Sequence, residues 1–242
     1  MFNRRMPRQL MIRESRNGFS IVELLVIIAI LVALAAFILP LRRSAGEAAR
    51  RAQCQNNVKQ ITTALHKYAA EHGAFPPAFT VGPNGQRLHS WRTLILPYLD
   101  QRNLYSRIDL SKPWNDPVNS EAANSSLSAY KCPESKSSIA RAHTPYLAVI
   151  SPDGCFQGPE AKKLADLPGE VRRTMAVVDA GFKRAVHWMS PDDIDSSQLF
   201  EIAAEVSDTH LGVLIIGFAD GSARQVFPDT INRATAIAGD VQ

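Results

Sequence analysis

"GFSIVELLVIIAILVALAAFILP", Gly18 to Pro40, is a long apolar run that one charged residue, Glu23, interrupts near its start. The 21 residues from Phe19 to Leu39 are enough to cross the hydrocarbon core of a membrane as a helix, and too many for the apolar part of a typical signal peptide. A carboxylate inside such a segment costs several kcal/mol unless it is neutralised or paired. We therefore expect Glu23 to have a partner.

Residues 1–18, ahead of this run, form a basic leader. They contain five arginines and one glutamate, a net charge of +4, which equals the formal net charge of the 242-residue chain. The rest of the chain is balanced, so the charge gives no reason to expect nucleic-acid binding. Basic residues also follow the apolar run, and charge alone leaves its orientation open.

Gly18, the aromatic Phe19 and Glu23, at the fifth position of a hydrophobic helix, occur together as in a prepilin N-terminus. In this respect the chain resembles type IV pilins and the pseudopilins of type II secretion. The resemblance implies that a membrane aspartyl prepilin peptidase cleaves between Gly18 and Phe19 and N-methylates the new terminus. It also implies a single-pass protein of the inner membrane with an extracytoplasmic head, which reaches the periplasm or cell surface as a filament if it assembles.

Cleavage would give Glu23 a partner. The new α-amino group at Phe19 would be largely cationic at neutral pH, because its pKa is about 8. In a filament, the amine of one subunit can meet Glu23 of its neighbour, and at about 4 Å and an effective dielectric constant of about 20 the attraction is roughly 4 kcal/mol before desolvation. The alternative is a bare anchor that tolerates Glu23 near its end, which leaves Gly18 and Phe19 unexplained.

The helix is expected to continue beyond residues 19–40, although Pro40 favours a kink or pause. Residues 41–72 are rich in good helix formers, and Gly73 is a typical C-terminal cap. Apolar or small residues recur in steps of four and three and predict one stripe that packs on a head: Cys54, Val58, Ile61, Leu65 and Tyr68.

Residues 73–242 are expected to form that head. Residues 91–105 are typical of one short helix or of a broken turn, and short apolar runs predict strands at 146–150, 174–178, 213–218 and 223–227. Asp220-Gly221 between the last two runs indicates a hairpin. The predicted fold class is α+β, with a pilin-like long N-terminal transmembrane helix packed against a head that contains an antiparallel β-sheet.

Several blocks also resemble a large pilin-like family that is abundant in planctomycetes and has no assigned molecular function. They read "ARRAQCQNNVKQITTALHKYAAEHGAFPPA", "WRTLILPYLDQRNLY", "YKCPES", "VHWMSPDDI" and "HLGVLIIGFADGSARQV". The family has a C-terminal motif of His, nine residues and Asp-Gly, and His210 with Asp220-Gly221 has this spacing. The chain departs from the family at Leu211-Gly212, where paired glycines are usual, and at "LPGEVRRT".

The three cysteines, Cys54, Cys132 and Cys155, allow three single disulfides, and an extracytoplasmic head favours one of them. Cys54 and Cys132 both lie in blocks that resemble the family, and Cys54 lies on the apolar stripe. We therefore expect a Cys54–Cys132 bridge. The alternative is three reduced, buried thiols.

No catalytic, cofactor or metal site is expected. If a strand joins His210 to Asp220, ten residues place them roughly 33 Å apart, too far to share a metal ion. The acidic segment with Asp192, Asp193 and Asp195 lacks the turn glycine and final glutamate of an EF-hand, and a solvated loop is expected there. P-loop, Rossmann, zinc-type and nucleophile-elbow motifs are absent from the sequence.

Two functions fit these observations. The first is a structural subunit that a prepilin peptidase/methyltransferase processes and that assembles with other pilin-like subunits into a type IV pilus or a type II secretion-like filament at the inner membrane. The second is a membrane-anchored extracytoplasmic module that binds glycan or secreted cargo. An anchored hydrolase has no support in the sequence.

Overall fold

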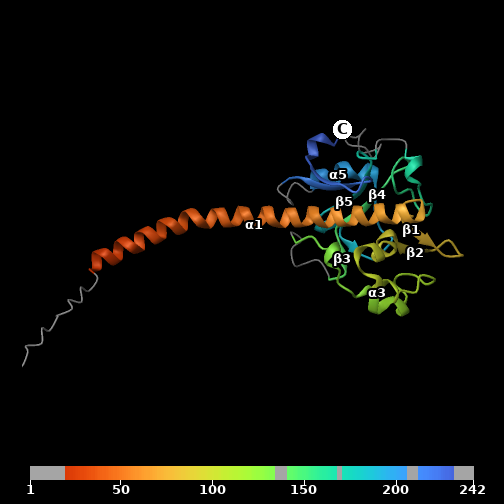
Figure 1. Cartoon of the computed structure of the whole chain (residues 1–242), viewed down its shortest axis with the longest axis horizontal. Coiled ribbons are helices and arrows are strands. Elements are labelled where there is room, and N and C mark those ends of the chain that lie inside the picture. Colours follow the sequence, from red (N-terminus) through yellow and green to blue (C-terminus); the bar gives the residue numbers. More distant parts are fainter. Residues whose placement is uncertain (1–19, 134–140, 168–170, 206–211, 232–242) are drawn as a thin grey trace, which may run out of the picture. The chain divides into compact units, whose positions relative to one another are not determined.

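The computed structural model describes residues 20–133, 141–167, 171–205 and 212–231. The chain divides into two compact units, residues 1–45 and 46–242. Helix α1 (Ile21–His72) contributes residues to both units, and all the strands belong to the second (Figure 1).

The N-terminus of α1 is stabilised by polar contacts in its first turn. Glu23 lies there, where a carboxylate interacts favourably with the helix dipole. The hydroxyl of Ser20 accepts from the amide of Val22 at 3.3 Å, and the Ser20 amide donates to Glu23 Oε2 at 3.4 Å. Pro40 lies inside α1, so the helix continues past it as expected, and Gly73 follows its end with a φ of 76°.

The expected fold class is wrong in one part. Spanning a membrane requires about 20 consecutive apolar residues in one helix. Among the residues that the structure describes, no helix has both the length and the apolarity that this requires. The transmembrane helix of the expected fold is therefore contradicted, whereas the α+β class with a β-sheet is observed.

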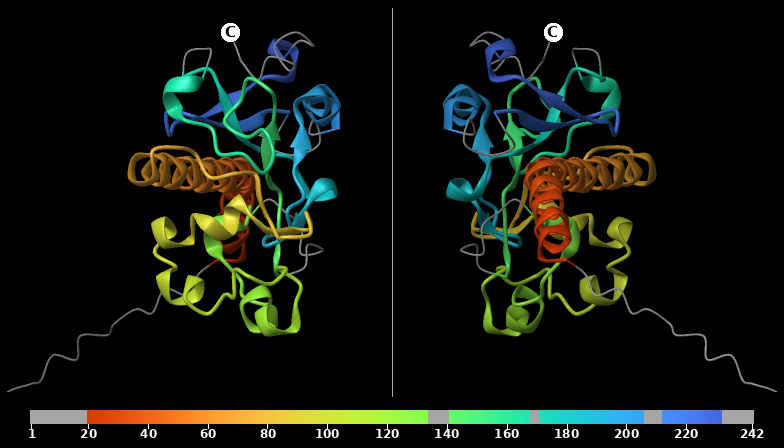
Figure 2. Two further views of the ribbon diagram at one scale, coloured as in Figure 1. Left: turned by 90° about the vertical axis from the view of Figure 1, so that its right-hand side faces the viewer. Right: turned by 90° about the vertical axis from the view of Figure 1, so that its left-hand side faces the viewer.

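The described part of the head contains one five-stranded sheet and two small two-stranded sheets (Figures 1 and 2). The strand order of the large sheet is β7-β4-β5-β8-β9, antiparallel except for the parallel pair β4–β7. The small sheets pair β1 with β2 and β3 with β6. The strands are β1 (Phe79–Val81), β2 (Arg87–Ser90), β3 (His143–Thr144), β4 (Tyr146–Ile150), β5 (Met175–Asp179), β6 (Val186–His187), β7 (Ile194–Asp195), β8 (Leu214–Phe218) and β9 (Ala223–Val226).

Four of these strands were predicted from the sequence to within one residue at each end: β4, β5, β8 and β9. Residues 91–105 do not form one short helix. They form the broken turn, the other arrangement expected from the sequence. It consists of α2 (Trp91–Leu94), a 3₁₀ turn (Leu96–Leu99) that contains Pro97, and α3 (Arg102–Tyr105). Asp100 separates the last two in a left-handed conformation, with a φ of 59°. Two further α-helices among the described residues are α4 (Ser120–Ala123) and α5 (Leu199–Glu205).

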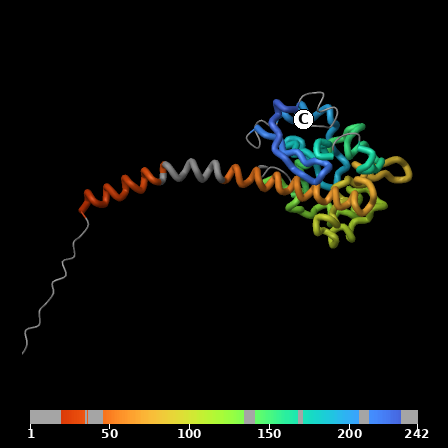
Figure 3. The backbone as a smooth tube through the Cα atoms, turned by 45° about the horizontal axis from the view of Figure 1, so that its top comes forward, coloured from red at the N-terminus to blue at the C-terminus, as the bar shows by residue number. Residues whose placement is uncertain are grey.

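Apolar residues are buried in two clusters of the head. The first includes the predicted stripe of α1 from Cys54 to Leu65, together with the sheet residues Val177 and Ile215. The second includes residues that alternate with these along the strands, such as Val178 and Ile216, and residues of α5. Because successive strand residues point to opposite faces, α1 and α5 cover opposite faces of the sheet. Figure 3 follows the backbone from α1 to the C-terminal hairpin, in blue.

The closest approach of α1 to the sheet occurs at Gly217 in β8. A Cβ atom there would lie 2.3 Å from Thr62 Cγ2 and 2.8 Å from Val58 Cγ1, both on α1. Such distances are shorter than van der Waals contact, so glycine allows the helix to pack directly on the strand.

Candidate functional site

The N-terminal unit presents a continuous apolar surface with one carboxylate. Large apolar side chains from residue 21 to residue 34 have exposed fractions between 42% and 78%. They are Ile21, Val22, Leu24, Leu25, Val26, Ile27, Ile28, Ile30, Leu31, Val32 and Leu34. Glu23 lies in the first turn of this helix, whereas Gly18 and Phe19, the expected cleavage site, lie outside the described residues.

Within the head, a disulfide joins α1 to the loop around residue 132. It links Cys54 and Cys132, the pair expected from the sequence, with 5.0 Å between their Cα atoms. The two residues are 78 positions apart in the chain. Cys155 is free and buried, and burial raises the pKa of its thiol to about 12. This thiol is therefore protonated and unreactive at neutral pH.

Polar residues beside Cys54 make further links between α1 and the head. The side-chain Nδ2 of Asn57 donates to the carbonyl of Lys131 at 2.6 Å. Gln55 Nε2 donates to the carbonyl of Ala223 at 3.0 Å, and Gln225 Nε2 donates to Gln55 Oε1 at 2.9 Å. Residues of the block "AQCQNN", which resembles the family, therefore contact two distant parts of the head.

A buried carboxylate lies beside the disulfide. Asp179 offers an oxygen within 4.8 Å of the sulfur atoms of Cys54 and Cys132, and its Oδ1 accepts from the amide of Gly181 at 3.1 Å. Over the described ranges this is the only group of three His, Cys, Asp or Glu side chains close enough to share a metal ion. Because both sulfurs belong to the disulfide, they offer no thiolate, and the group is not a metal site as it stands.

The acidic segment before β7 differs from the expected solvated loop. The side chain of Asp193 is only 4% exposed, and its Oδ1 lies 2.6 Å from Arg92 Nη2. The same oxygen accepts from the amide of Ala148 at 2.7 Å and from Trp91 Nε1 at 3.2 Å. Asp192 and Asp195 are exposed. The expectation was wrong for Asp193 because its cation lies 101 residues earlier, on α2.

Arg92 is fully buried, and all five of its N–H donors have acceptors. Its Nε donates to the carbonyl of Tyr146 at 3.0 Å, and its Nη1 donates to Ser90 Oγ at 2.7 Å and to the carbonyl of Ser190 at 3.1 Å. Its Nη2 donates to the carbonyl of Asp192 and to Asp193. The ion pair therefore joins α2, β4 and the segment before β7, and its role is structural.

The environment of Asp193 shifts its pKa. Burial raises the pKa of Asp193 to about 6, against the opposing effects of Arg92 and of the hydrogen bonds from Ala148 and Trp91. At neutral pH the residue is therefore ionised and paired. A cavity of about 290 Å³ adjoins it, between the β1–β2 hairpin, the loop after β4 and the segment before β7.

The C-terminal motif is described in part. Gly221 has a φ of 83°, and the amide of Ser222 donates to Asp220 Oδ1 at 2.9 Å, so Asp220-Gly221 makes the β8–β9 turn as expected. The hydroxyl of Thr62 on α1 lies 3.1 Å from the carbonyl of Gly221. His210 lies outside the described residues, and its separation from Asp220 stays a prediction.

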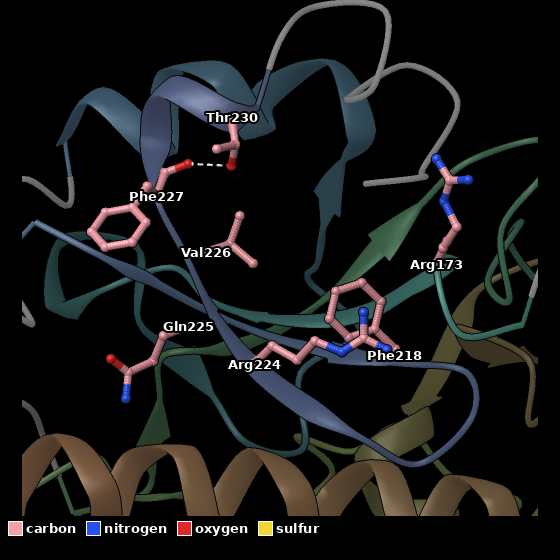
Figure 4. Close-up of a pocket in the computed structure, with 7 residues that line it drawn as sticks. All are labelled: Arg173, Phe218, Arg224, Gln225, Val226, Phe227 and Thr230. Atoms are coloured by element: carbon pink, nitrogen blue, oxygen red, sulfur yellow. Dashed lines mark hydrogen bonds between the residues drawn. The ribbon is translucent and has the colours of Figure 1, made fainter. Parts of the chain in front are cut away.

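A larger groove lies along the β8–β9 hairpin (Figure 4). Its volume is about 690 Å³. No sequence motif marks this groove, because its residues come from three separate segments of the chain. They are Arg173, Phe218, Arg224, Gln225, Val226, Phe227 and Thr230.

Comparison with known proteins identifies a family for the chain. Residues 43–170, more than half of the chain, match the family described as "Protein of unknown function (DUF1559)". No curated protein and no solved structure matches the chain significantly. The matched region contains both cysteines of the disulfide and Arg92, and it contains neither the expected cleavage site nor His210 and Asp220-Gly221. The chain therefore belongs to this family of unknown function, the planctomycete pilin-like family that its sequence blocks resemble.

Proposed function

We propose that this chain is a pilin-like structural subunit that assembles through the N-terminal part of α1 into a type IV pilus or a type II secretion-like filament. A prepilin peptidase/methyltransferase would first cleave between Gly18 and Phe19. The other partners would be further pilin-like subunits. The proposed role is mechanical and not enzymatic.

The observation that carries this proposal is the exposed apolar surface of residues 21–34 with Glu23 at its start. Contiguous apolar surface of this extent on a protein indicates a binding partner. Copies of the same helix are suitable partners, since they bury this surface against one another. Glu23 would then be buried too and would need a cation, which the methylated amine of Phe19 on a neighbouring subunit supplies.

In such a filament, the contacts between α1 and the rest of the head would transmit force from the packed helices to the heads at the surface. The disulfide, Asn57 and Gln55 attach the head-side part of α1 to the rest of the head through covalent and polar links. A disulfide also fits a head that lies outside the cytoplasm, because disulfides persist in oxidising compartments. We therefore propose an extracytoplasmic location for the head.

The test is assembly of a Glu23→Ala variant in cells. We expect normal cleavage, with N-methylated Phe19 at the mature N-terminus, but few or no filaments by electron microscopy and in sheared-fibre fractions. Glu47→Ala is the matched control, because Glu47 lies on the same helix but in the head unit. Wild-type filament yield from Glu23→Ala, or an intact Met1 in the wild type, would contradict the proposal.

A further inference from the structure

The groove in Figure 4 is lined by arginine and aromatic side chains. Both ionisable residues that line it are arginines: Arg173, two residues before β5, and Arg224 in β9. Its lining, as far as the structure describes it, contains no carboxylate. Asp220 beside the groove forms an ion pair with Arg224, with 3.8 Å between Asp220 Oδ2 and Arg224 Nη2, which is longer than a hydrogen bond. Arg224 is therefore the residue of the groove with which an anionic group would pair.

Arg224 is held in position before any ligand arrives. Its guanidinium lies over the ring of Phe218, with 4.5 Å from the central carbon to the ring centroid. Its Nη2 donates to the carbonyl of Arg172 at 3.0 Å. Because these contacts fix the plane of the guanidinium, binding of a ligand to it would cost little conformational entropy.

Arg224 also keeps hydrogen-bonding capacity for a ligand. Its side chain is 46% exposed, and within the described part of the chain its Nε and Nη1 groups have no acceptor. An arginine with free N–H donors beside a groove is suited to carboxylate, sulfate or phosphate groups, since charge-assisted hydrogen bonds to such oxyanions are strong.

The opposite end of the groove is aromatic. Phe227 follows β9 and is 61% exposed. It lies three residues beyond Arg224, about 10 Å along an extended chain. Figure 4 shows the ring of Phe227 at the end of the groove away from Arg224 and Arg173. An exposed aromatic face offers a flat apolar surface to which the C–H face of a sugar ring can pack.

We propose that this groove binds an acidic saccharide, whose carboxylate or sulfate group pairs with Arg224 while a neighbouring ring packs on Phe227. An acidic peptide is less suited, because a peptide commonly binds by adding a strand to a sheet edge. Strand β9 is at the edge of the five-stranded sheet. The carbonyl of Ala223 on that strand already accepts a hydrogen bond from Gln55 of α1.

Binding is tested with the full-length protein, kept in solution by a mild detergent, and four polymers of defined chemistry. Polygalacturonate carries carboxylates, dextran sulfate carries sulfates, dextran is neutral, and poly-glutamate is an acidic peptide. We expect at least one of the acidic glycans to bind, more weakly at high salt, and dextran not to bind. The stronger of the two identifies the anionic group.

Three variants distinguish binding in the groove from nonspecific electrostatic attraction to the protein. Arg224→Gln should weaken binding about tenfold or more, as loss of a charge-assisted hydrogen bond requires. Phe227→Ala should weaken binding of the glycan. Arg107→Gln is the matched control, because Arg107 is an exposed arginine paired with Glu121 elsewhere on the head. It should bind as the wild type does.

The proposal is overturned if neither acidic glycan binds, if dextran binds equally well, or if Arg107→Gln loses as much affinity as Arg224→Gln. The proposal is also rejected if poly-glutamate binds more tightly than the glycans and Phe227→Ala does not affect that binding. This result would assign the groove to an acidic peptide. Filament assembly of Arg224→Gln should be normal, so failure of this proposal and failure of the filament proposal are distinguishable.

Discussion

Arg92 Nη2 lies 2.6 Å from Asp193 Oδ1 in the interior of the head, and neither side chain is more than 4% exposed. A buried ion pair is costly to break, because removal of one partner leaves the other charge without compensation. The pair links "WRTL" and "SPDD", which both lie in blocks that resemble the family and are far apart in the sequence.

Asp193→Ala should therefore lower the free energy of unfolding by about 3–5 kcal/mol, because Arg92 stays buried without its anion. The measurement is equilibrium denaturation in urea at pH 7. Glu121→Ala is the control. It removes the exposed pair with Arg107 and should change stability by no more than about 1 kcal/mol. Equal effects of the two substitutions would show that the buried pair is not special.

Stability should also depend on pH through His89. This side chain is fully buried, and its Nε2 lies 2.8 Å from the carbonyl of Lys112, so the neutral ring donates there. Burial lowers the pKa of His89 below its usual 6.5. The unfolded chain then binds a proton more readily than the folded one, and His89 destabilises the fold as pH falls below about 6.5.

His89→Gln keeps a donor for Lys112 but does not titrate. We expect the wild type to lose more stability than this variant between pH 7.5 and pH 5.5, as measured by thermal unfolding at each pH. Both proteins contain Asp193, so the difference between their stability curves reports the titration of His89. The raised pKa of Asp193 has the opposite effect on stability over part of this pH range. Parallel stability curves would contradict the prediction.

The disulfide should contribute about 2–4 kcal/mol, because it closes a long loop in the unfolded chain. The double variant Cys54→Ser/Cys132→Ser should lose this amount in denaturant unfolding. Cys155→Ala should keep the bridge, since Cys155 is free. Peptide mapping without reduction provides the direct check, and a bridge that includes Cys155 would contradict the assigned pairing.

Gly217→Ala should destabilise the head by about 1–3 kcal/mol, because its Cβ would lie 2.3 Å from Thr62 Cγ2. Thr62→Ser removes that methyl group and keeps the hydroxyl near the carbonyl of Gly221. In a double-mutant cycle, Gly217→Ala should therefore cost less in the Thr62→Ser background than in the wild type. Additive effects would show that α1 and β8 are not in contact at this point.

The sequence by itself determined the local elements of this protein. The apolar runs of β4, β5, β8 and β9, the Asp220-Gly221 turn and the stop of α1 at Gly73 all depend on residues that are neighbours in the chain. Family-like blocks also indicated the Cys54–Cys132 pair. For the strands, the turn and the helix stop, the physical cause, hydrophobic periodicity or backbone freedom, is present within a few residues.

Only the tertiary structure decided the burial of Asp193 and the position of the arginine-lined groove. An isolated "SPDDIDSS" is typical of a solvated loop, and Asp193 becomes buried because Arg92, Trp91 and Ala148 converge on it from other segments. Arg173 and Arg224 likewise meet at one groove only because β5 and β9 both flank β8. Such long-range pairings depend on the packing of the whole head, and no local pattern of residues specifies them.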